Sequence, residues 1–210
     1  KLAGGALRRS RSRSAAVRSR CGADEGPPFA PYSEKSDQKE EEALRVLMTG
    51  GGTAGHINPA LAIADTIKEK NPDAEILFVG AKGRMETTLV PAAGYPIKTV
   101  DVRGFQRRLS LKNIGRNVSA AVHAVTAGGA CVRILKEFRP DIAIGTGGYV
   151  SGPILRKAAA MGIPVLVHES NAYPGVTVKM LAKVASAVML CDESAKKYLP
   201  EGCRTVVTGN

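Results

Sequence analysis

Short runs of β-branched and other apolar residues alternate with longer segments of helical spacing from Leu44 to the end of the chain. The short runs predict strands at residues 45–49, 75–79, 97–100, 141–144, 165–167, 187–190 and 205–207. The helical spacing, often with proline at the start or glycine at the end, predicts helices at residues 59–70, 85–93, 114–138, 153–161, 176–185 and 194–198. This alternation predicts an α/β fold, a doubly wound parallel sheet of about seven strands.

Residues 1–43 carry almost no periodic apolar positions. The segment is rich in arginine and serine, then in glycine and proline, and ends in the acidic run Glu40, Glu41 and Glu42. Such a composition buries too little apolar surface to fold, so we expect a disordered tail at 1–43 and one domain at 44–210. The Arg-rich, acid-poor start also resembles an organelle transit peptide, although non-native or upstream sequence explains a chain that begins at Lys1 equally well.

Charge and cysteine content narrow the partners and the compartment. The chain holds 30 Lys and Arg against 19 Asp and Glu, and the excess persists after residue 43, which favours anionic partners such as phosphates, nucleic acid or acidic lipid. Its four cysteines are scattered without C-x-x-C spacing, so we expect reduced thiols in a cytosolic protein. No uninterrupted apolar run reaches the roughly 18 to 20 residues of a membrane-spanning helix, so we expect any membrane contact to be peripheral.

Three loops rich in glycine or polar residues follow the first, fourth and fifth predicted strands. In doubly wound sheets, ligands bind outside the carboxyl ends of the strands where the strand order reverses, commonly between the first and fourth strands. We therefore expect the three loops to meet at one ligand site. The candidate substrate-binding residues are Gly51, Gly52, Thr53, Ala54 and Gly55 after the first strand, Gly147, Gly148, Tyr149 and Ser151 after the fourth, and His168 and Asn171 after the fifth.

His56 and Glu169 are the candidate catalytic residues, because imidazole and carboxylate groups at such a site can transfer protons. Each candidate has a structural alternative. The glycines can serve tight turns alone, His56 can simply cap or pack near its helix, and Glu169 can cap a helix or loop. Two glycine-rich loops at one switch point favour phosphate binding at a helix start over turn chemistry alone.

Residues 103–116 combine five basic residues with apolar residues and contain no acid. A mixed apolar and basic surface suits an anionic membrane face. The alternative is an ordinary solvated helix entry whose leucines reach the core. The candidate membrane-docking residues are Arg103, Phe105, Arg107, Arg108, Leu109, Leu111, Lys112, Ile114 and Arg116.

Three motifs in the same order carry a family resemblance: Gly-Gly-Thr-Ala-Gly-His-Ile-Asn-Pro-Ala-Leu-Ala at 51–62, Gly-Gly-Tyr-Val-Ser-Gly-Pro at 147–153 and His-Glu-Ser-Asn at 168–171. Residues 44–210 thereby resemble the MurG family, the undecaprenyl-diphospho-muramoylpentapeptide N-acetylglucosaminyltransferases of peptidoglycan synthesis. The resemblance implies a GT-B glycosyltransferase whose Rossmann-like N-terminal domain receives the lipid-linked acceptor. The chain resembles that domain only, so we expect the C-terminal donor domain to be absent beyond Asn210.

For the complete enzyme, the resemblance implies an inverting transfer of N-acetylglucosamine from UDP-N-acetylglucosamine to lipid I, which gives lipid II. His56 corresponds to the essential histidine, either as general base or as diphosphate ligand, and Asn171 to a donor-contacting position. Thr53, Ala54 and Gly55 correspond to a loop near the acceptor diphosphate, and Ala54 stands where many members have glycine.

The same resemblance sets our expectations for cofactors, partners and location. We expect no cofactor, and nothing indicates a metal, because the chain has no Asp-x-Asp pair. The expected partners are UDP-N-acetylglucosamine, lipid I and an anionic inner-membrane surface, with no nucleic acid. The expected location is the cytoplasmic face of the bacterial cell membrane, by peripheral attachment.

Two other functions are consistent with parts of the sequence. Gly50, Gly52 and Gly55 satisfy the dinucleotide fingerprint of a nucleotide-dependent oxidoreductase. That fingerprint also requires an acid at the end of the second strand, where the chain reads Val-Gly-Ala-Lys at 79–82. A binding-only module that holds phosphate or a membrane surface without turnover is the other alternative.

Overall fold

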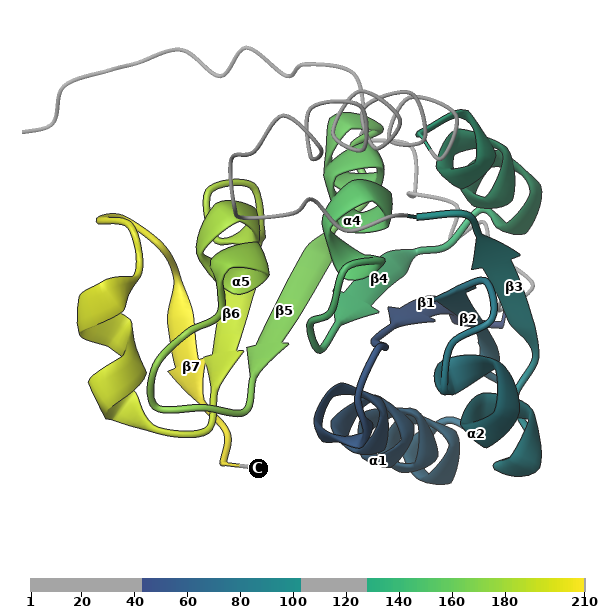
Figure 1. The fold of residues 1–210 in the computed structure, drawn as a ribbon, viewed down its shortest axis with the longest axis horizontal. Helices are drawn as coiled ribbons and strands as arrows, with labels where there is room; N and C mark the ends of the chain where they lie inside the picture. Colours follow the sequence, from purple (N-terminus) through teal and green to yellow (C-terminus); the bar gives the residue numbers. More distant parts are fainter. Residues whose placement is uncertain (1–42, 103–127, 210) are drawn as a thin grey trace, which may run out of the picture. The chain divides into compact units, whose positions relative to one another are not determined.

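The computed structural model describes residues 43–102 and 128–209. Seven strands form one parallel sheet in the order β3-β2-β1-β4-β5-β6-β7 (Figure 1). This arrangement confirms the predicted doubly wound α/β fold. The strands are β1 Arg45–Thr49, β2 Glu75–Ala81, β3 Ile97–Val100, β4 Ile142–Gly145, β5 Val165–Glu169, β6 Ala187–Leu190 and β7 Thr205–Val207.

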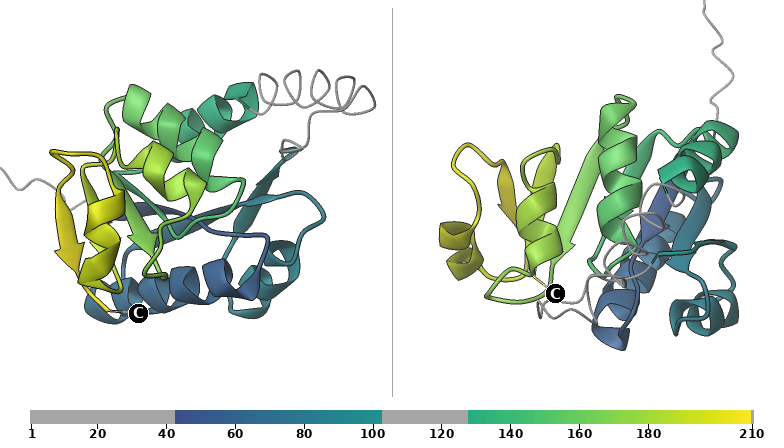
Figure 2. Two further views of the ribbon diagram at one scale, coloured as in Figure 1. Left: turned by 60° about the vertical axis from the view of Figure 1, so that its left-hand side comes forward. Right: turned by 45° about the horizontal axis from the view of Figure 1, so that its top comes forward.

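Helices cover both faces of the sheet (Figures 1 and 2). Two helices, α1 and α2, pack on one face, and residues 128–138, α4 and α5 pack on the other. The bounds are α1 Ala54–Lys70, α2 Glu86–Ala92, α4 Ser151–Ala160 and α5 Val176–Leu181, with a 3-10 helix η1 at Glu193–Tyr198. None of the helices in the described part of the chain is long and apolar enough to cross a bilayer.

Helix α1 begins earlier than the predicted start at residue 59. It starts at Ala54, directly after the first glycine loop, and contains Pro59. Proline lacks the N–H that would bond to the carbonyl of Gly55, one turn earlier. Gly55 is solvent-exposed, so water can bind that carbonyl and the helix tolerates the proline.

Two expectations fall wholly or partly outside the described residues. The predicted tail at 1–43 lies outside them except for Ala43. Of the predicted helix at 114–138, residues 128–138 are helical. The part of that helix before residue 128 stays a prediction.

The alternation of side chains along β1 explains how both faces of the sheet are buried. Leu47 belongs to the core cluster under α4 and α5, whereas Val46 and Met48 belong to the cluster under α1 and α2. Successive side chains of a strand point to opposite faces, and a parallel sheet covered on both faces therefore needs a nearly continuous apolar run. Burying each such side chain contributes about 1.5–3 kcal/mol before the cost of ordering the chain.

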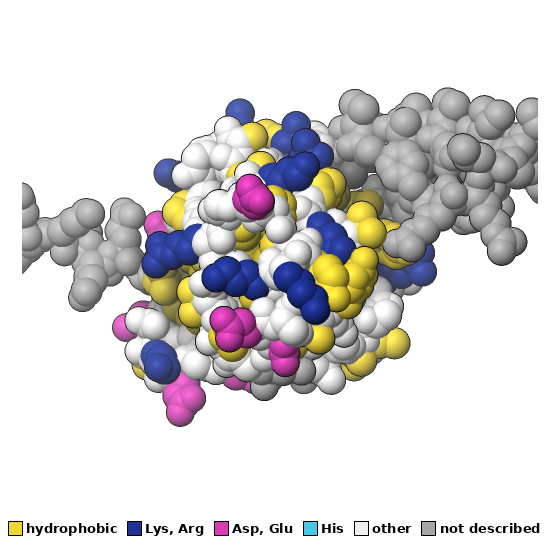
Figure 3. All heavy atoms as spheres, turned by 90° about the vertical axis from the view of Figure 1, so that its left-hand side faces the viewer, with side chains coloured by type: hydrophobic (Ala, Val, Ile, Leu, Met, Phe, Trp, Pro, Cys, Tyr) yellow, Lys and Arg dark blue, Asp and Glu magenta, His cyan; other side chains and the backbone are white. Residues whose placement is uncertain are grey.

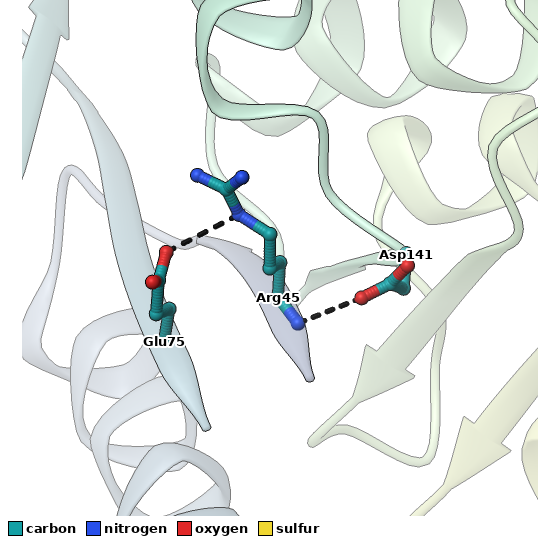
Figure 4. A network of polar contacts seen from close by, with 3 residues as sticks. All are labelled: Arg45, Glu75 and Asp141. Carbon is teal, nitrogen blue, oxygen red and sulfur yellow. Dashed lines mark hydrogen bonds and ion pairs between the residues drawn. The ribbon is translucent and has the colours of Figure 1, made fainter. Parts of the chain in front are cut away.

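Arg45, Glu75 and Asp141 connect the amino ends of three adjacent strands (Figure 4). The Arg45 backbone N–H donates to Asp141 Oδ2 at 2.8 Å. Arg45 Nε lies 3.2 Å from Glu75 Oε2 as an ion pair, but its N–H is not aligned for a hydrogen bond. Because both side chains of the ion pair are partly exposed, we expect this pair to stabilise the fold only weakly.

The strand register sets the position of the candidate site. Thr49 at the end of β1 pairs with Gly145 at the end of β4, and Gly145 pairs with Val167 of β5. The loops that follow these strands therefore leave the sheet at one edge. The strand order reverses between β1 and β4, which confirms the predicted switch point.

Candidate functional site

The three predicted loops line a single cavity of about 290 Å³. It lies at the carboxyl edge of the sheet, beside the switch point. The predicted residues that line it are Gly51, Gly52, Thr53, His56, Gly147, Gly148, Tyr149, Glu169 and Asn171. The start of α5, from Gly175 to Val178, completes the lining and was not predicted from the sequence.

The first glycine loop leads into the positive end of α1. Thr53 is the N-terminal cap residue, and its carbonyl accepts the N–H groups of His56 and Ile57 at 3.1 and 3.2 Å. Gly52 has a φ of +85°, a conformation that favours glycine. The first turn of α1 contains no acid. The helix start therefore favours an anionic ligand through its dipole and its free N–H groups.

His56 is fixed by Thr146, the first residue after β4. Its Nδ1 lies 3.0 Å from the Thr146 carbonyl oxygen. Because a carbonyl can only accept, Nδ1 carries the proton and Nε2 of the neutral ring keeps its lone pair. The Thr146 hydroxyl donates in return to the His56 carbonyl at 2.5 Å. The geometry thus gives the half-buried His56 ring a free proton acceptor, Nε2.

The second glycine loop packs tightly against the first. Gly147 has a φ of +111°, and a Cβ there would lie 2.7 Å from His56 Nδ1. Gly148 has a φ of +88°, and its Cβ would lie 2.3 Å from the Gly51 carbonyl oxygen. Only glycine fits at either position. These two glycines therefore let the loops approach each other and leave room for the imidazole ring.

Ser151 and the pair Ala54 and Gly55 lie near the cavity without lining it. The buried Ser151 hydroxyl donates to the Gly147 carbonyl at 2.6 Å. Ser151 therefore stabilises the second glycine loop through this hydrogen bond. Ala54 and Gly55 form the exposed first turn of α1, and their contribution to the site is through the helix start.

Glu169 organises the loop that follows β5. Its Oε1 accepts the Asn171 backbone N–H at 2.9 Å and the Asn171 side-chain amide at 2.7 Å. Its Oε2 accepts the Gly175 N–H at 2.8 Å. Both oxygens are thus engaged, and the side chain is 3% exposed. These bonds favour the capping alternative over the predicted catalytic role of Glu169.

His168 is separated from the other candidates. It is buried, and it lines a second cavity of about 400 Å³ whose other walls are mainly apolar residues of α1 and Met189. Its Nε2 lies 3.2 Å from the Gly209 carbonyl oxygen, and its Nδ1 lies 3.4 Å from the Ser170 hydroxyl. The polar groups that suit a phosphate or sugar ligand lie in the smaller cavity, which we take as the candidate site.

Glu86 is a buried carboxylate that contacts the first glycine loop and was not predicted from the sequence. It is 1% exposed and accepts the backbone N–H groups of Gly52 and Ala81, each at 2.9 Å. One signal was present in the sequence: Glu86 lies four residues before the buried Val90 in the short helix α2. That spacing places both on the face that packs against the sheet.

The cysteine thiols of the described residues are poor nucleophiles. Burial raises the pKa of Cys131 to about 11. Burial and the carboxylates of Asp192 and Glu169 raise the pKa of Cys191, and burial raises the pKa of Cys203. A reactive cysteine needs the opposite shift, so these thiols do not suggest covalent catalysis.

The described residues also give little support to metal or dinucleotide binding. They contain no cluster of three or more His, Cys, Asp or Glu side chains placed to hold a metal ion. The Gly52 N–H, which a dinucleotide phosphate would use, already donates to Glu86. The predicted membrane-docking residues from Arg103 to Arg116 lie outside the described residues.

Comparisons with known proteins agree with one another. Residues 46–190 match the family model described as the glycosyltransferase family 28 N-terminal domain. A relative from Phocaeicola vulgatus is 49% identical over 170 residues, and the match covers 81% of this chain and 44% of the relative. It is named UDP-N-acetylglucosamine--N-acetylmuramyl-(pentapeptide) pyrophosphoryl-undecaprenol N-acetylglucosamine transferase. A relative of the same name from Ruminiclostridium cellulolyticum is also 49% identical, with coverage of 80% and 45%.

A solved structure shows the same similarity in three dimensions. The crystal structure of Acinetobacter baumannii MurG superimposes with a TM-score of 0.65 and 30% sequence identity. The match covers 80% of this chain and 46% of that structure. The chain therefore spans less than half the length of these three proteins.

Proposed function

The chain belongs to the glycosyltransferase family 28 N-terminal domain family, and from this premise we propose that it is the acceptor-binding half of an N-acetylglucosaminyltransferase. The complete enzyme would transfer N-acetylglucosamine from UDP-N-acetylglucosamine to the muramoyl 4-hydroxyl of lipid I and so produce lipid II. The names of the relatives support both substrates. The cavity between two glycine loops, with His56 Nε2 free to accept a proton, is the observation that carries the proposal.

His56 is assigned as the general base of this transfer. The acceptor oxygen forms a bond to the anomeric carbon of the donor sugar while the bond to the UDP oxygen breaks, which inverts that carbon. The hydroxyl proton moves to His56 Nε2. Ligation of the acceptor diphosphate is the alternative role for His56, and the positive end of α1 beside it supports an anion at this place.

The other proposed roles follow the loops of the cavity. Gly51, Gly52 and Thr53 form the wall on the α1 side, and Gly147, Gly148 and Tyr149 form the wall on the α4 side. Asn171, held by Glu169, reaches the donor. The chemistry needs no cofactor, because the hydroxyl is activated by proton transfer and UDP is the leaving group.

The acceptor also determines where such an enzyme works. An undecaprenyl tail remains in the bilayer, so the protein must reach it from the anionic cytoplasmic face of the membrane. We assign docking to residues 103–116, whose composition suits that surface. Attachment is peripheral in this proposal.

Binding of the acceptor by the purified 210-residue chain tests the proposal directly. A fluorescent, short-chain lipid I analogue should give saturable anisotropy, and an excess of unlabelled analogue should displace it. The surface variant Glu137→Ala should bind equally well, because Glu137 lies on the helical residues 128–138 and does not line the cavity. Absence of saturable binding would overturn the acceptor-binding assignment.

Turnover tests the second part of the proposal. We expect the isolated chain to transfer no sugar from UDP-N-acetylglucosamine, because most of the donor site belongs to the other half. Joined to the C-terminal half of the Phocaeicola vulgatus relative, it should transfer radiolabelled sugar to the same analogue. Robust turnover by the isolated chain would refute the half-enzyme assignment, and a joined protein that binds both substrates without turnover would refute the reaction.

A further inference from the structure

The buried carboxylate of Glu86 connects two segments that are far apart in the sequence. Glu86 opens α2, and its Oε2 accepts the N–H of Gly52 in the first glycine loop at 2.9 Å. Its Oε1 accepts the N–H of Ala81, the last residue of β2, at 2.9 Å. One side chain thus holds the first glycine loop against the end of the neighbouring strand.

Glu86 relies on backbone N–H groups for its stabilisation. The two ion pairs found within residues 43–102 and 128–209 are Arg45 with Glu75 and Lys98 with Glu137. A buried carboxylate is costly unless hydrogen bonds replace its water. The N–H groups of Gly52 and Ala81 provide that replacement, so breaking either bond should destabilise the loop.

Two glycines make room for the Glu86 side chain. A Cβ at Gly51 would lie 2.3 Å from Glu86 Oε1, and a Cβ at Gly80 would lie 2.6 Å from Glu86 Cγ. Gly51 is not among the glycines of positive φ. Its backbone would accept alanine, so the carboxylate of Glu86 explains why this position needs glycine.

We infer that Glu86 is a positioning residue whose carboxylate acts as the built-in anion of the first glycine loop. Backbone N–H groups of glycine-rich loops commonly bind a phosphate. Here Glu86 takes the Gly52 N–H instead, holds Gly52 in its left-handed conformation and so fixes the cavity wall formed by Gly51, Gly52 and Thr53. The Gly52 N–H is therefore not available to a phosphate of the ligand. The inference rests on the proposed function only for the identity of the ligand in the cavity.

Chemical rescue tests the built-in anion. Glu86→Ala removes an acetate-sized group and leaves two unsatisfied N–H groups, so the Tm should fall by roughly 5 °C or more. Sodium acetate should restore most of that loss, whereas sodium chloride at the same concentration should not. The difference in Tm between the two salts should be much smaller for the wild type, where it measures only the general salt effect. If the variant does not fold, its refolding yield in acetate against chloride gives the same comparison. A difference between the two salts that is the same for the variant as for the wild type would overturn the inference.

A double-mutant cycle tests the contact between Gly51 and Glu86. Gly51→Ala should lower the Tm of the wild type clearly, and of the Glu86→Ala protein much less, because the clashing carboxylate is gone. Gly162→Ala is the matched control: Gly162 has a φ of +78° and open space around it. Its cost should be the same in both backgrounds. If the Tm losses of Gly51→Ala and Glu86→Ala were additive, the carboxylate would not determine the conformation of the loop.

Ligand binding separates positioning from general stability. At a temperature where both proteins are folded, Glu86→Ala should bind the fluorescent lipid I analogue at least tenfold more weakly, a loss typical of a positioning contact. Acetate should recover part of that affinity. Unchanged affinity would refute the positioning role. If the wild type does not bind the analogue, the proposed function fails, while the acetate rescue and the double-mutant cycle still decide the role of Glu86.

Discussion

In the proposed role of general base, the imidazole of His56 depends on a single hydrogen bond. Nδ1 donates to the Thr146 carbonyl, so the neutral ring has its free lone pair on Nε2. The same bond orients the ring beside Gly147, where any side chain would collide with it. A general base needs both the correct tautomer and a fixed position, and one backbone carbonyl supplies both.

Replacement of His56 should therefore affect the chemical step in the enzyme completed with its donor half. We expect His56→Ala to lower kcat by about 100-fold or more, the usual effect of losing an acid–base group. His56→Asn keeps a donor for the Thr146 carbonyl but has no equivalent of Nε2, so it should be equally slow and more stable than His56→Ala. Steady-state kinetics and Tm measurements check both variants.

The division of the loss between kcat and KM identifies the role of His56. A loss in kcat with little change in KM for the acceptor supports the general base, whereas a rise in KM alone supports the diphosphate ligand. Near-normal values of both constants would remove His56 from the mechanism. Glu137→Ala, which lies away from the cavity, is the control for the assay.

At the residue scale, the residues that belong to recognisable motifs could be predicted from the sequence. The two glycine loops and His56 stand at fixed places after strands, and the structure brings them to one cavity. Glu86 has no motif, and its role depends on the distance between two loops that only folding sets. Glu169 has a motif, but the sequence alone could not show that its oxygens bind Asn171 and Gly175.

At the scale of elements, Tyr95 connects the segment after α2 to helix α1. Its hydroxyl donates to Asp65 Oδ1 at 2.6 Å, and its ring lies 5.4 Å from the ring of Phe78. Burial, the hydrogen bond to Asp65 and the charge of Asp65 together raise the pKa of Tyr95 to about 12. The contact thus stabilises the protonated phenol of the folded state.

Stability should therefore depend on pH through Tyr95 in the alkaline range. The unfolded phenol ionises near its ordinary pKa of 10, whereas the folded phenol stays protonated until about 12. The unfolded state loses its proton first, so the stabilisation is complete below pH 10 and is lost as the pH rises toward 12. Tyr95→Phe and Asp65→Asn should both reduce this alkaline loss of unfolding free energy.

Urea unfolding of wild type and variants across that pH range measures the difference in unfolding free energy. Comparison with the variants removes the common titration of lysines and other tyrosines. Asp73 is an exposed acid outside this contact. Asp73→Asn should leave the slope of unfolding free energy against pH as it is in the wild type. A wild-type slope that survives both Tyr95→Phe and Asp65→Asn would exclude Tyr95 as its source.

The sequence predicted the strands better than the helix ends. β1, β3, β6 and β7 have the predicted bounds, because each is a compact run of β-branched or other apolar residues between turn residues. Pro59 suggested a helix start, but α1 begins at Ala54, since the glycine loop already turns the chain into the helix. α5 ends at Leu181 rather than at residue 185, because helical spacing alone does not mark where the last turn opens.

At the scale of the whole molecule, one face of the protein carries many basic side chains. Lysine and arginine side chains are spread over the face that carries η1 and β7 (Figure 3). They include the exposed Lys196, Lys197 and Arg204. Such a surface raises the local concentration of anionic partners at low salt. A test of membrane binding must therefore distinguish general electrostatic attraction of the whole protein from binding through one docking segment.

Membrane docking through residues 103–116 is the prediction that such a test addresses. Five cations near an anionic surface contribute on the order of 1 kcal/mol each, and salt weakens this term. The apolar members of the segment add a part that resists salt. A chain trimmed to begin near Glu42, because residues 1–20 are also basic, should sediment with vesicles of phosphatidylglycerol or cardiolipin and not with neutral vesicles. Glutamine should abolish most binding when it replaces Arg103, Arg107, Arg108, Lys112 and Arg116.

A matched variant makes this result specific. This variant replaces five exposed cations elsewhere in the described residues with glutamine and so removes the same charge. It should keep most of the binding. The five positions are Lys68, Lys70, Lys196, Lys197 and Arg204. Equal losses in the two variants would mean that net charge alone attracts the protein to the bilayer. If the trimmed chain ignores anionic vesicles, or binds them equally well after the substitutions in 103–116, that segment is not the docking surface. The proposed acceptor, lipid I, would then have to be reached through another face of the protein.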